Sequence, residues 1–164
     1  MKSMRVIVQV VTLVASAAVP SAAQSAGQQH VYATPSTLKW GPGPDSLPAG
    51  AQAAVIDGDP TQAGMFVIRL KFPNGYTVPP HWHPTDENVV VLQGTMRIGM
   101  GDKVDEKTAV QLPVGSFIKL PKEMHHYAIA AGESIVQVHG MGPFAITYVN
   151  KIDDPRTKAS TTPR

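Results

Sequence analysis

The sequence has 164 residues, of which 43% are hydrophobic, 16% charged and 6% aromatic, and it contains 15 prolines and 14 glycines. This composition is typical of one domain built from short strands and many turns, and it argues against a helical bundle or a coiled coil. The absence of cysteine excludes a disulfide scaffold, a thiolate metal site and a cysteine nucleophile.

The first 23 residues have the pattern of a secretory signal peptide. Lys2 and Arg5 precede a largely apolar run at residues 6–19, and small residues follow at Ser21 and Ala23. The run is about 14 residues long, which is too short to span roughly 30 Å of hydrocarbon. We therefore predict cleavage near Ala23, or a few residues later, and export to the periplasm or the cell exterior with no membrane span left in the mature chain.

The mature chain carries no net charge. Removing Lys2 and Arg5 from the 14 basic residues leaves 12, which equals the 12 acidic residues. Binding to a phosphate backbone needs an excess of basic side chains, so we predict no nucleic-acid partner.

Short strands are predicted along most of the mature chain. Residues 24–45 are polar and rich in small residues, which predicts a flexible N-terminal arm containing His30, and residues 151–164 form a polar tail. Between them, residues 46–150 predict a barrel or sandwich, because period-two alternation recurs between turn signals such as Asn74-Gly75 and Gln93-Gly94. The predicted strands lie at residues 66–72, 76–83, 88–92, 95–100, 109–112, 116–120, 125–130, 134–139 and 145–149.

Two histidines at the end of the second predicted strand are followed by a glutamate at the start of the third. His81 and His83 are two residues apart, so a strand directs both side chains to the same face. Glu87 follows at the start of the next strand, directly before the apolar run at residues 89–92. Two imidazoles and a carboxylate that converge can bind a divalent transition metal and leave open positions, whereas the bland alternative is a solvated polar strand.

Two spaced motifs in this region resemble those of the cupin superfamily, the RmlC-like cupins. The first, G-x5-H-x-H-x3–4-E-x6-G, is matched at every defined position by Gly75, His81, His83, Glu87 and Gly94. The second, G-x5-P-x-G-x2-H-x3-N, is matched by Gly115, Pro121 and His126, while Glu123 replaces its glycine and Ala130 its asparagine. The resemblance implies an all-β fold, a small double-stranded β-helix or jelly-roll barrel, in a single-domain metal-binding cupin.

The resemblance also implies a ligand set. It assigns His81, His83, Glu87 and His126 to one divalent transition metal, with iron, manganese, zinc, nickel and copper all left open. His125 competes with His126 for the fourth place because Glu123 loosens the register, and strand alternation allows only one of the two to face inward. The motif spacing favours His126, which would leave His125 on the outer face or at the rim of a pocket.

A later strand supplies two further candidates. Gln137 and His139 share one face of it, opposite Val136 and Val138. The pair either lines the pocket and orients a ligand, or lies on the surface while the two valines are buried; the sequence leaves both readings open.

The leading functional hypothesis is an exported cupin enzyme that acts on a small organic molecule by oxygenase- or lyase-type chemistry. The family's activities imply this class, and no catalytic residue is assigned beyond the metal ligands. The alternative is a non-catalytic module that binds a small ligand or a metal, such as a zinc-type sensor or a structural metal site. A homodimer is a further expectation from the family.

Overall fold

The computed structural model describes residues 30–159, and the predicted signal peptide lies outside them. Strands form most of this part of the chain, and two short helices follow the last strand. The strands are β1 (Gly41–Pro42), β2 (Gln52–Asp57), β3 (Gly64–Phe72), β4 (Thr77–Trp82), β5 (Glu87–Gln93), β6 (Thr95–Met100), β7 (Val110–Pro113), β8 (Phe117–Leu120), β9 (His126–Ala130), β10 (Ser134–Gly142) and β11 (Thr147–Tyr148).

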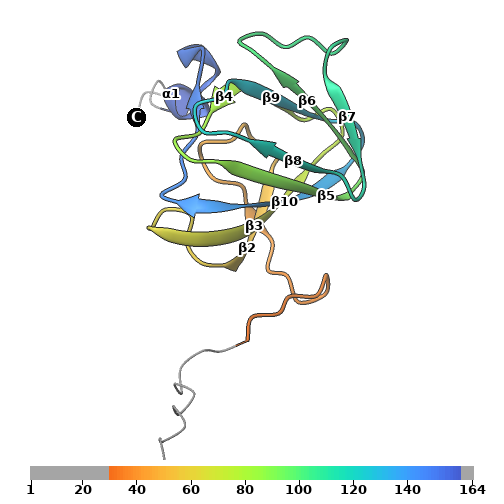
Figure 1. Ribbon diagram of the computed structural model, residues 1–164, viewed down its shortest axis with the longest axis vertical. Coiled ribbons are helices and arrows are strands. Elements are labelled where there is room, and N and C mark those ends of the chain that lie inside the picture. The colour runs from red at the N-terminus through yellow and green to blue at the C-terminus, as the bar shows by residue number, and fades with distance from the viewer. Residues whose placement is uncertain (1–29, 160–164) are drawn as a thin grey trace, which may run out of the picture. The chain divides into compact units, whose positions relative to one another are not determined.

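The strands form two sheets, which Figure 1 shows as two layers. The first has the order β1-β2-β3-β10-β5-β8, and the second has the order β11-β4-β9-β6-β7. All of the described pairings are antiparallel. Most neighbouring strands, such as β3 and β10 or β4 and β9, are not consecutive in the chain, as in a jelly roll. This arrangement confirms the predicted all-β fold.

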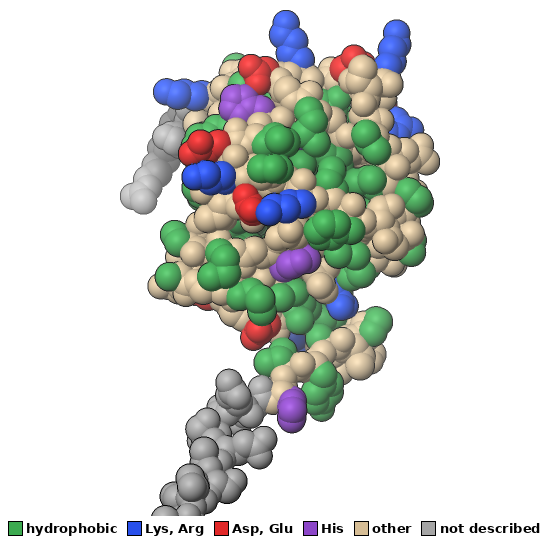
Figure 2. All heavy atoms as spheres, viewed as in Figure 1, with side chains coloured by type: hydrophobic (Ala, Val, Ile, Leu, Met, Phe, Trp, Pro, Cys, Tyr) green, Lys and Arg blue, Asp and Glu red, His purple; other side chains and the backbone are tan. Residues whose placement is uncertain are grey.

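Period-two alternation explains which side chains lie between the sheets. Along β3, Phe66, Ile68, Leu70 and Phe72 are buried, and the residues between them are more exposed. The neighbouring strand β10 repeats the pattern, with Val136 opposite Leu70 and Val138 opposite Ile68. On the face shown in Figure 2, basic and acidic side chains are interspersed among apolar ones.

Several element boundaries differ from the predicted ones. Strand β2 was not predicted, and β1 lies within the predicted arm, where Gly41 pairs with Ala53 of β2. The strand predicted at 145–149 is shorter, because only Thr147–Tyr148 pairs with β4.

The predicted polar tail contains two short helices. These are the 3-10 helix η1 (Lys151–Asp153) and the helix α1 (Pro155–Ala159). Arg156 of α1 donates a hydrogen bond to the Ile146 carbonyl at 3.1 Å, which connects the helix to the barrel. It also donates to the Asp154 carboxylate, directly before the helix, at 2.7 Å. None of the described helices combines the length and apolar character that a membrane crossing requires.

Candidate metal centre

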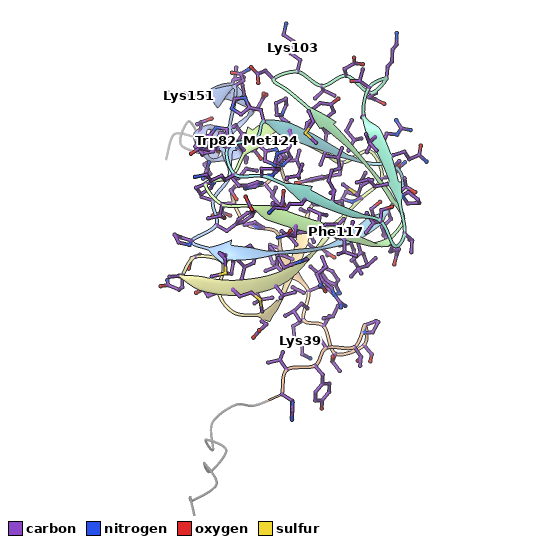
Figure 3. The ribbon with its side chains drawn as sticks, in the orientation of Figure 1. Lys39, Trp82, Lys103, Phe117, Met124 and Lys151 are labelled. Carbon is purple, nitrogen blue, oxygen red and sulfur yellow. The ribbon has the colours of Figure 1, made fainter. Side chains whose placement is uncertain are left out.

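Three histidine side chains meet inside the barrel. His81 of β4 lies directly opposite His126 of β9 in the antiparallel pair, and His83 follows β4 by one residue. One ring nitrogen from each histidine lies within 4.8 Å of the other two, and all three residues are buried. Figure 3 labels Trp82, which lies between His81 and His83 in the chain, and Met124, which precedes His126 by two residues. The three histidines are therefore arranged so that they could hold a metal ion.

Backbone carbonyls fix the orientation of each ring. The Nδ1 atoms lie 2.7 Å from the Pro79 carbonyl oxygen for His81, 2.8 Å from that of Ala145 for His83, and 2.9 Å from that of Met124 for His126. Because a carbonyl only accepts hydrogen bonds, each Nδ1 carries the proton and donates it. Each Nε2 then presents a lone pair, which is the form of imidazole that binds metals.

Glu87 supplies a carboxylate beside two of these nitrogens. Its Oε2 atom lies 3.4 Å from His83 Nε2 and 3.3 Å from His126 Nε2. Burial by itself would raise the pKa of the Glu87 carboxyl, but the contacts with His126 and His83 outweigh it and hold that pKa below its ordinary value. Burial, with smaller effects from His126 and His83, lowers the pKa of His81 to about 3. At neutral pH the site therefore combines a carboxylate with an uncharged His81 ring.

Two observations show that these residues fit a transition metal. The Nε2 atom of His83 is buried and has no hydrogen-bond partner among the described residues, so a donor nitrogen is left free inside the barrel. Two ligand atoms about 2.0–2.1 Å from one ion at a tetrahedral angle lie roughly 3.3–3.4 Å apart. The two contacts of Glu87 have this separation, which is long for a charge-assisted hydrogen bond.

An apolar cavity of about 250 Å³ adjoins the histidines. Exposed residues of two loops, Pro44 and Thr61, line it as well as buried strand residues, so the cavity reaches the surface there. The remaining lining is mostly hydrocarbon and comes from both sheets and from the loops: Leu47, Pro60, Ile68, Leu70, Phe72, Val78, Val89, Met96, Ile98, Leu120, Ala128, Val136, Val138, Phe144 and Ile146, with Ser46. A small molecule in this cavity would lie against the candidate metal ligands.

Residues 37–150 match the family described as "Domain of unknown function (DUF4437)". The chain belongs to this DUF4437 family. The match covers all the described strands, from β1 to β11, and all four predicted metal ligands. No curated protein matches the chain.

Solved structures show that this DUF4437 chain has the cupin fold. The polyketide cyclase RemF from Streptomyces resistomycificus is 16% identical, with a TM-score of 0.60 over 81% of this chain and 94% of its own. A putative acetylacetone dioxygenase from Methylibium petroleiphilum is 15% identical, with a TM-score of 0.60 over 78% and 86%. An RmlC-like cupin from Shewanella frigidimarina is 14% identical, with a TM-score of 0.53 over 70% and 92%.

Three residues that the sequence analysis named as possible pocket residues do not line the cavity. The side chain of His125 is 40% exposed, and its Nδ1 atom lies 2.6 Å from the Asp102 carboxylate. Gln137 is hydrogen-bonded to Arg69 at 3.3 Å, on the side of β10 that faces away from the core. His139 lies on that same side. None of the three lines the cavity: Val136 and Val138 take the inward positions of β10, so Gln137 and His139 have the outward orientation that the sequence left open, and the buried neighbour of His125 is His126.

Sequence reasoning missed the loop residues that complete the DUF4437 site. Phe144 stacks on the His83 ring, with centroids 4.2 Å apart and an interplanar angle of 16°. Leu47 and Pro60 line the cavity from two other loops. These residues follow no periodic pattern, and the motifs at 75–94 and 115–126 do not include them, so the sequence carries no signal for their role.

Proposed function

We propose that this protein is an exported, metal-dependent cupin enzyme. It binds one divalent transition metal through His81, His83, Glu87 and His126, and it acts on a small organic molecule by oxygenase- or lyase-type chemistry. The observation that carries the proposal is the convergence of three oriented Nε2 atoms and one carboxylate on the wall of an apolar cavity that reaches the surface. A purely structural metal site needs no such cavity.

The side chains of the site have separate tasks in this proposal. The three histidines and Glu87 hold the ion, and the Pro79, Ala145 and Met124 carbonyls keep the rings in the binding tautomer. The hydrocarbon walls exclude water from the bound molecule. A divalent transition metal at this position supplies Lewis-acid chemistry, and iron or copper also supplies one-electron chemistry with O₂.

The fold neighbours support an enzyme. Two of the similar structures carry the names of enzymes, a polyketide cyclase and a putative acetylacetone dioxygenase, so this barrel is used for chemistry on small molecules in other proteins. The N-terminal pattern at residues 1–23 supports export. The mature chain would then take up its metal outside the cytoplasm.

Neighbouring histidines offer a matched test of the metal site. The chain from residue 24 onward is purified as the wild type and as the His126→Ala and His125→Ala variants, each is offered iron, manganese, zinc, nickel or copper, and bound metal is measured by elemental mass spectrometry. We expect about one ion per chain in the wild type and in His125→Ala, because His125 lies outside the cluster. We expect at least a tenfold loss in His126→Ala.

Circular dichroism on all three proteins verifies that each variant is folded. Equal metal content in the two variants would refute the assigned site. Stoichiometric zinc that does not respond to azide or to a chelating acid would favour the non-catalytic binding module instead.

A further inference from the structure

We infer that the cavity selects a compact apolar molecule that carries one pair of oxygen donor atoms at one end. The two oxygens share a single negative charge, as in the enolate of a β-diketone. The inference rests on the proposed function, because the oxygen donors would face the metal ligands. It goes further by excluding two large substrate classes, the sugars and the dicarboxylic acids. Three features of the site support it: the chemistry of the walls, the charge of the ligand set and the size of the cavity.

The walls offer a polar ligand almost no hydrogen bonds. Apart from the four candidate metal ligands, the only lining residues with polar side chains among residues 30–159 are Ser46 and Thr61, and both lie on loops. The Thr61 hydroxyl is exposed and already donates to Asp59 at 2.8 Å. Within the described part of the chain, no lining residue is a lysine, arginine, asparagine or glutamine. A sugar hydroxyl or a second carboxylate placed against these walls would lose its hydrogen bonds to water without replacement.

The charge of the ligand set points to a monoanion. Glu87 supplies one carboxylate, and the Pro79, Ala145 and Met124 carbonyls accept the Nδ1 protons, so each imidazole would bind the ion through Nε2 as a neutral ligand. A divalent ion brings two positive charges. The sum is one positive charge, which a singly charged chelator neutralises. A dicarboxylate would leave one negative charge in a cavity whose described lining residues include no lysine or arginine to receive it.

The size of the cavity limits the apolar part of the molecule. A volume of about 250 Å³ equals the space of roughly eight water molecules and lies below the usual range for drug-sized ligands. An apolar cavity of about 150 Å³ is already enough to hold benzene. One ring or a short branched chain, together with the chelating end, therefore fills the site.

Binding calorimetry with matched chelators tests the inference on the zinc-loaded protein. Pentane-2,4-dione and malonate form the same six-membered chelate ring, but the first ends in methyl groups and the second in additional charged oxygens. We expect the dione to bind at least about tenfold more tightly, and 1-phenylbutane-1,3-dione to bind more tightly still because its ring covers the walls. Malonate that binds as tightly as the dione would overturn the inference while leaving the metal site intact.

A substitution at the cavity mouth provides a test by gain of binding. Leu47 lies on the loop after β1, half-buried against the core, and lines the cavity. The Leu47→Lys variant brings an ammonium group to the hydrocarbon wall, so malonate binding should strengthen at least fivefold relative to the dione. Leu47→Met, which keeps the wall apolar, should retain the wild-type preference. An unchanged preference in Leu47→Lys would contradict the role of wall chemistry.

A ligand without donor atoms separates this inference from the proposed function. Toluene is titrated into the His126→Ala variant, in which the metal site is disrupted and the walls remain. Binding of toluene there supports an apolar ligand even if the wild-type protein retains no metal and the proposed function fails. Absence of toluene binding in both the variant and the wild type would overturn the apolar cavity whatever the metal content is.

Discussion

Phe144 and the neighbouring Ala145 carbonyl hold the His83 ring from two directions. The phenyl ring stacks on the imidazole at 4.2 Å, and the carbonyl accepts the Nδ1 proton at 2.8 Å. Phe144 also contacts Phe66, whose ring centroid lies 5.0 Å away, so its own position is fixed by the core. The orientation of one candidate metal ligand therefore depends on a residue that touches no metal.

Removing the Phe144 ring should weaken metal binding without unfolding the barrel. We expect Phe144→Ala to reduce metal affinity about tenfold, the lower end of the range for residues that orient metal ligands. A competition titration against a coloured chelator measures the affinity. Phe117→Ala is the matched control, because Phe117, labelled in Figure 3, is 58% exposed on β8. Equal affinities in the two variants would show that the stacked ring does not orient His83.

Glu123 has a backbone conformation that favours glycine. Its φ is 61°, and its backbone N–H donates to the His83 carbonyl at 2.8 Å, so the turn before β9 keeps a left-handed residue where the cupin motif has glycine. A residue with a side chain loses about 1–2 kcal/mol in this region. The turn therefore forms despite the substitution, at a cost to stability.

Restoring glycine should stabilise the protein. Glycine removes the left-handed penalty but adds freedom to the unfolded chain, which costs about 0.5–1 kcal/mol. We expect Glu123→Gly to raise the free energy of unfolding by about 0.5–1 kcal/mol, measured by urea denaturation. Lys122→Gly, at the adjacent exposed position, lacks the first effect and should lower it. A loss of stability in both variants would argue against strain at Glu123.

At the level of elements, β11 connects the metal site to the cavity mouth. Tyr148 of β11 pairs with His81 of β4, and its hydroxyl donates to the Ser46 carbonyl at 2.7 Å. Tyr76 binds the Pro48 carbonyl of the same loop. Burial raises the pKa of the Tyr148 phenol, so the hydroxyl remains a donor throughout the working pH range. Two buried phenols thus hold the loop that forms one side of the mouth.

Loss of the Tyr148 hydroxyl should loosen this loop specifically. We expect Tyr148→Phe to lower the free energy of unfolding by about 1 kcal/mol and to speed amide hydrogen exchange at residues 44–48. Tyr127→Phe is the control, because the Tyr127 hydroxyl donates to the Asp105 carbonyl in another loop. That variant should lose similar stability but keep the exchange rates of residues 44–48. The same exchange pattern in both variants would remove the assigned role of Tyr148.

Period-two alternation in the sequence predicted the strands whose apolar and polar side chains alternate. It did not predict strands that form only because they pair with a neighbouring strand. β3 is predictable because four apolar residues alternate along it. β2 has the sequence QAAVID, with two alanines and a weak pattern, and it exists because Ala53 and Val55 pair with Leu70 and Ile68 of β3. Propensity along the chain carries no information about such a partner.

The same distinction applies to the site. Strand alternation by itself placed His81 and His83 on one face, and the resemblance of the two motifs to those of the cupins added Glu87 and His126 to the ligand set. They could not show that Gln137 and His139 face outward, since the inward side of β10 is set by its pairing with β3. The carbonyl partner of His83 lies 62 residues away in the chain, beyond any local pattern.

For the whole molecule, the buried His81 ring makes the metal-free protein sensitive to acid. The pKa of the His81 ring is about 3 in the folded state, whereas the ordinary pKa of histidine is 6.5. Below pH 6.5 the unfolded chain binds a proton that the folded chain does not bind, so stability falls as the pH falls towards 3. Glu87, whose folded pKa is lowered, adds to this loss only below its ordinary value of 4.5. The window between pH 6.5 and 4.5 therefore reports mainly on His81.

We expect the chelator-treated protein to lose up to about 1.4 kcal/mol of unfolding free energy per pH unit from His81 as the pH falls through this window. Urea denaturation at pH 6.5, 5.5 and 4.5 measures the loss. The His81→Leu variant lacks this ring, so the slope of its unfolding free energy against pH should be smaller by the contribution of about one proton. The control His30→Gln changes an exposed histidine and should keep the wild-type slope. If His81→Leu retained the wild-type slope, the acid sensitivity would have to come from groups outside this site.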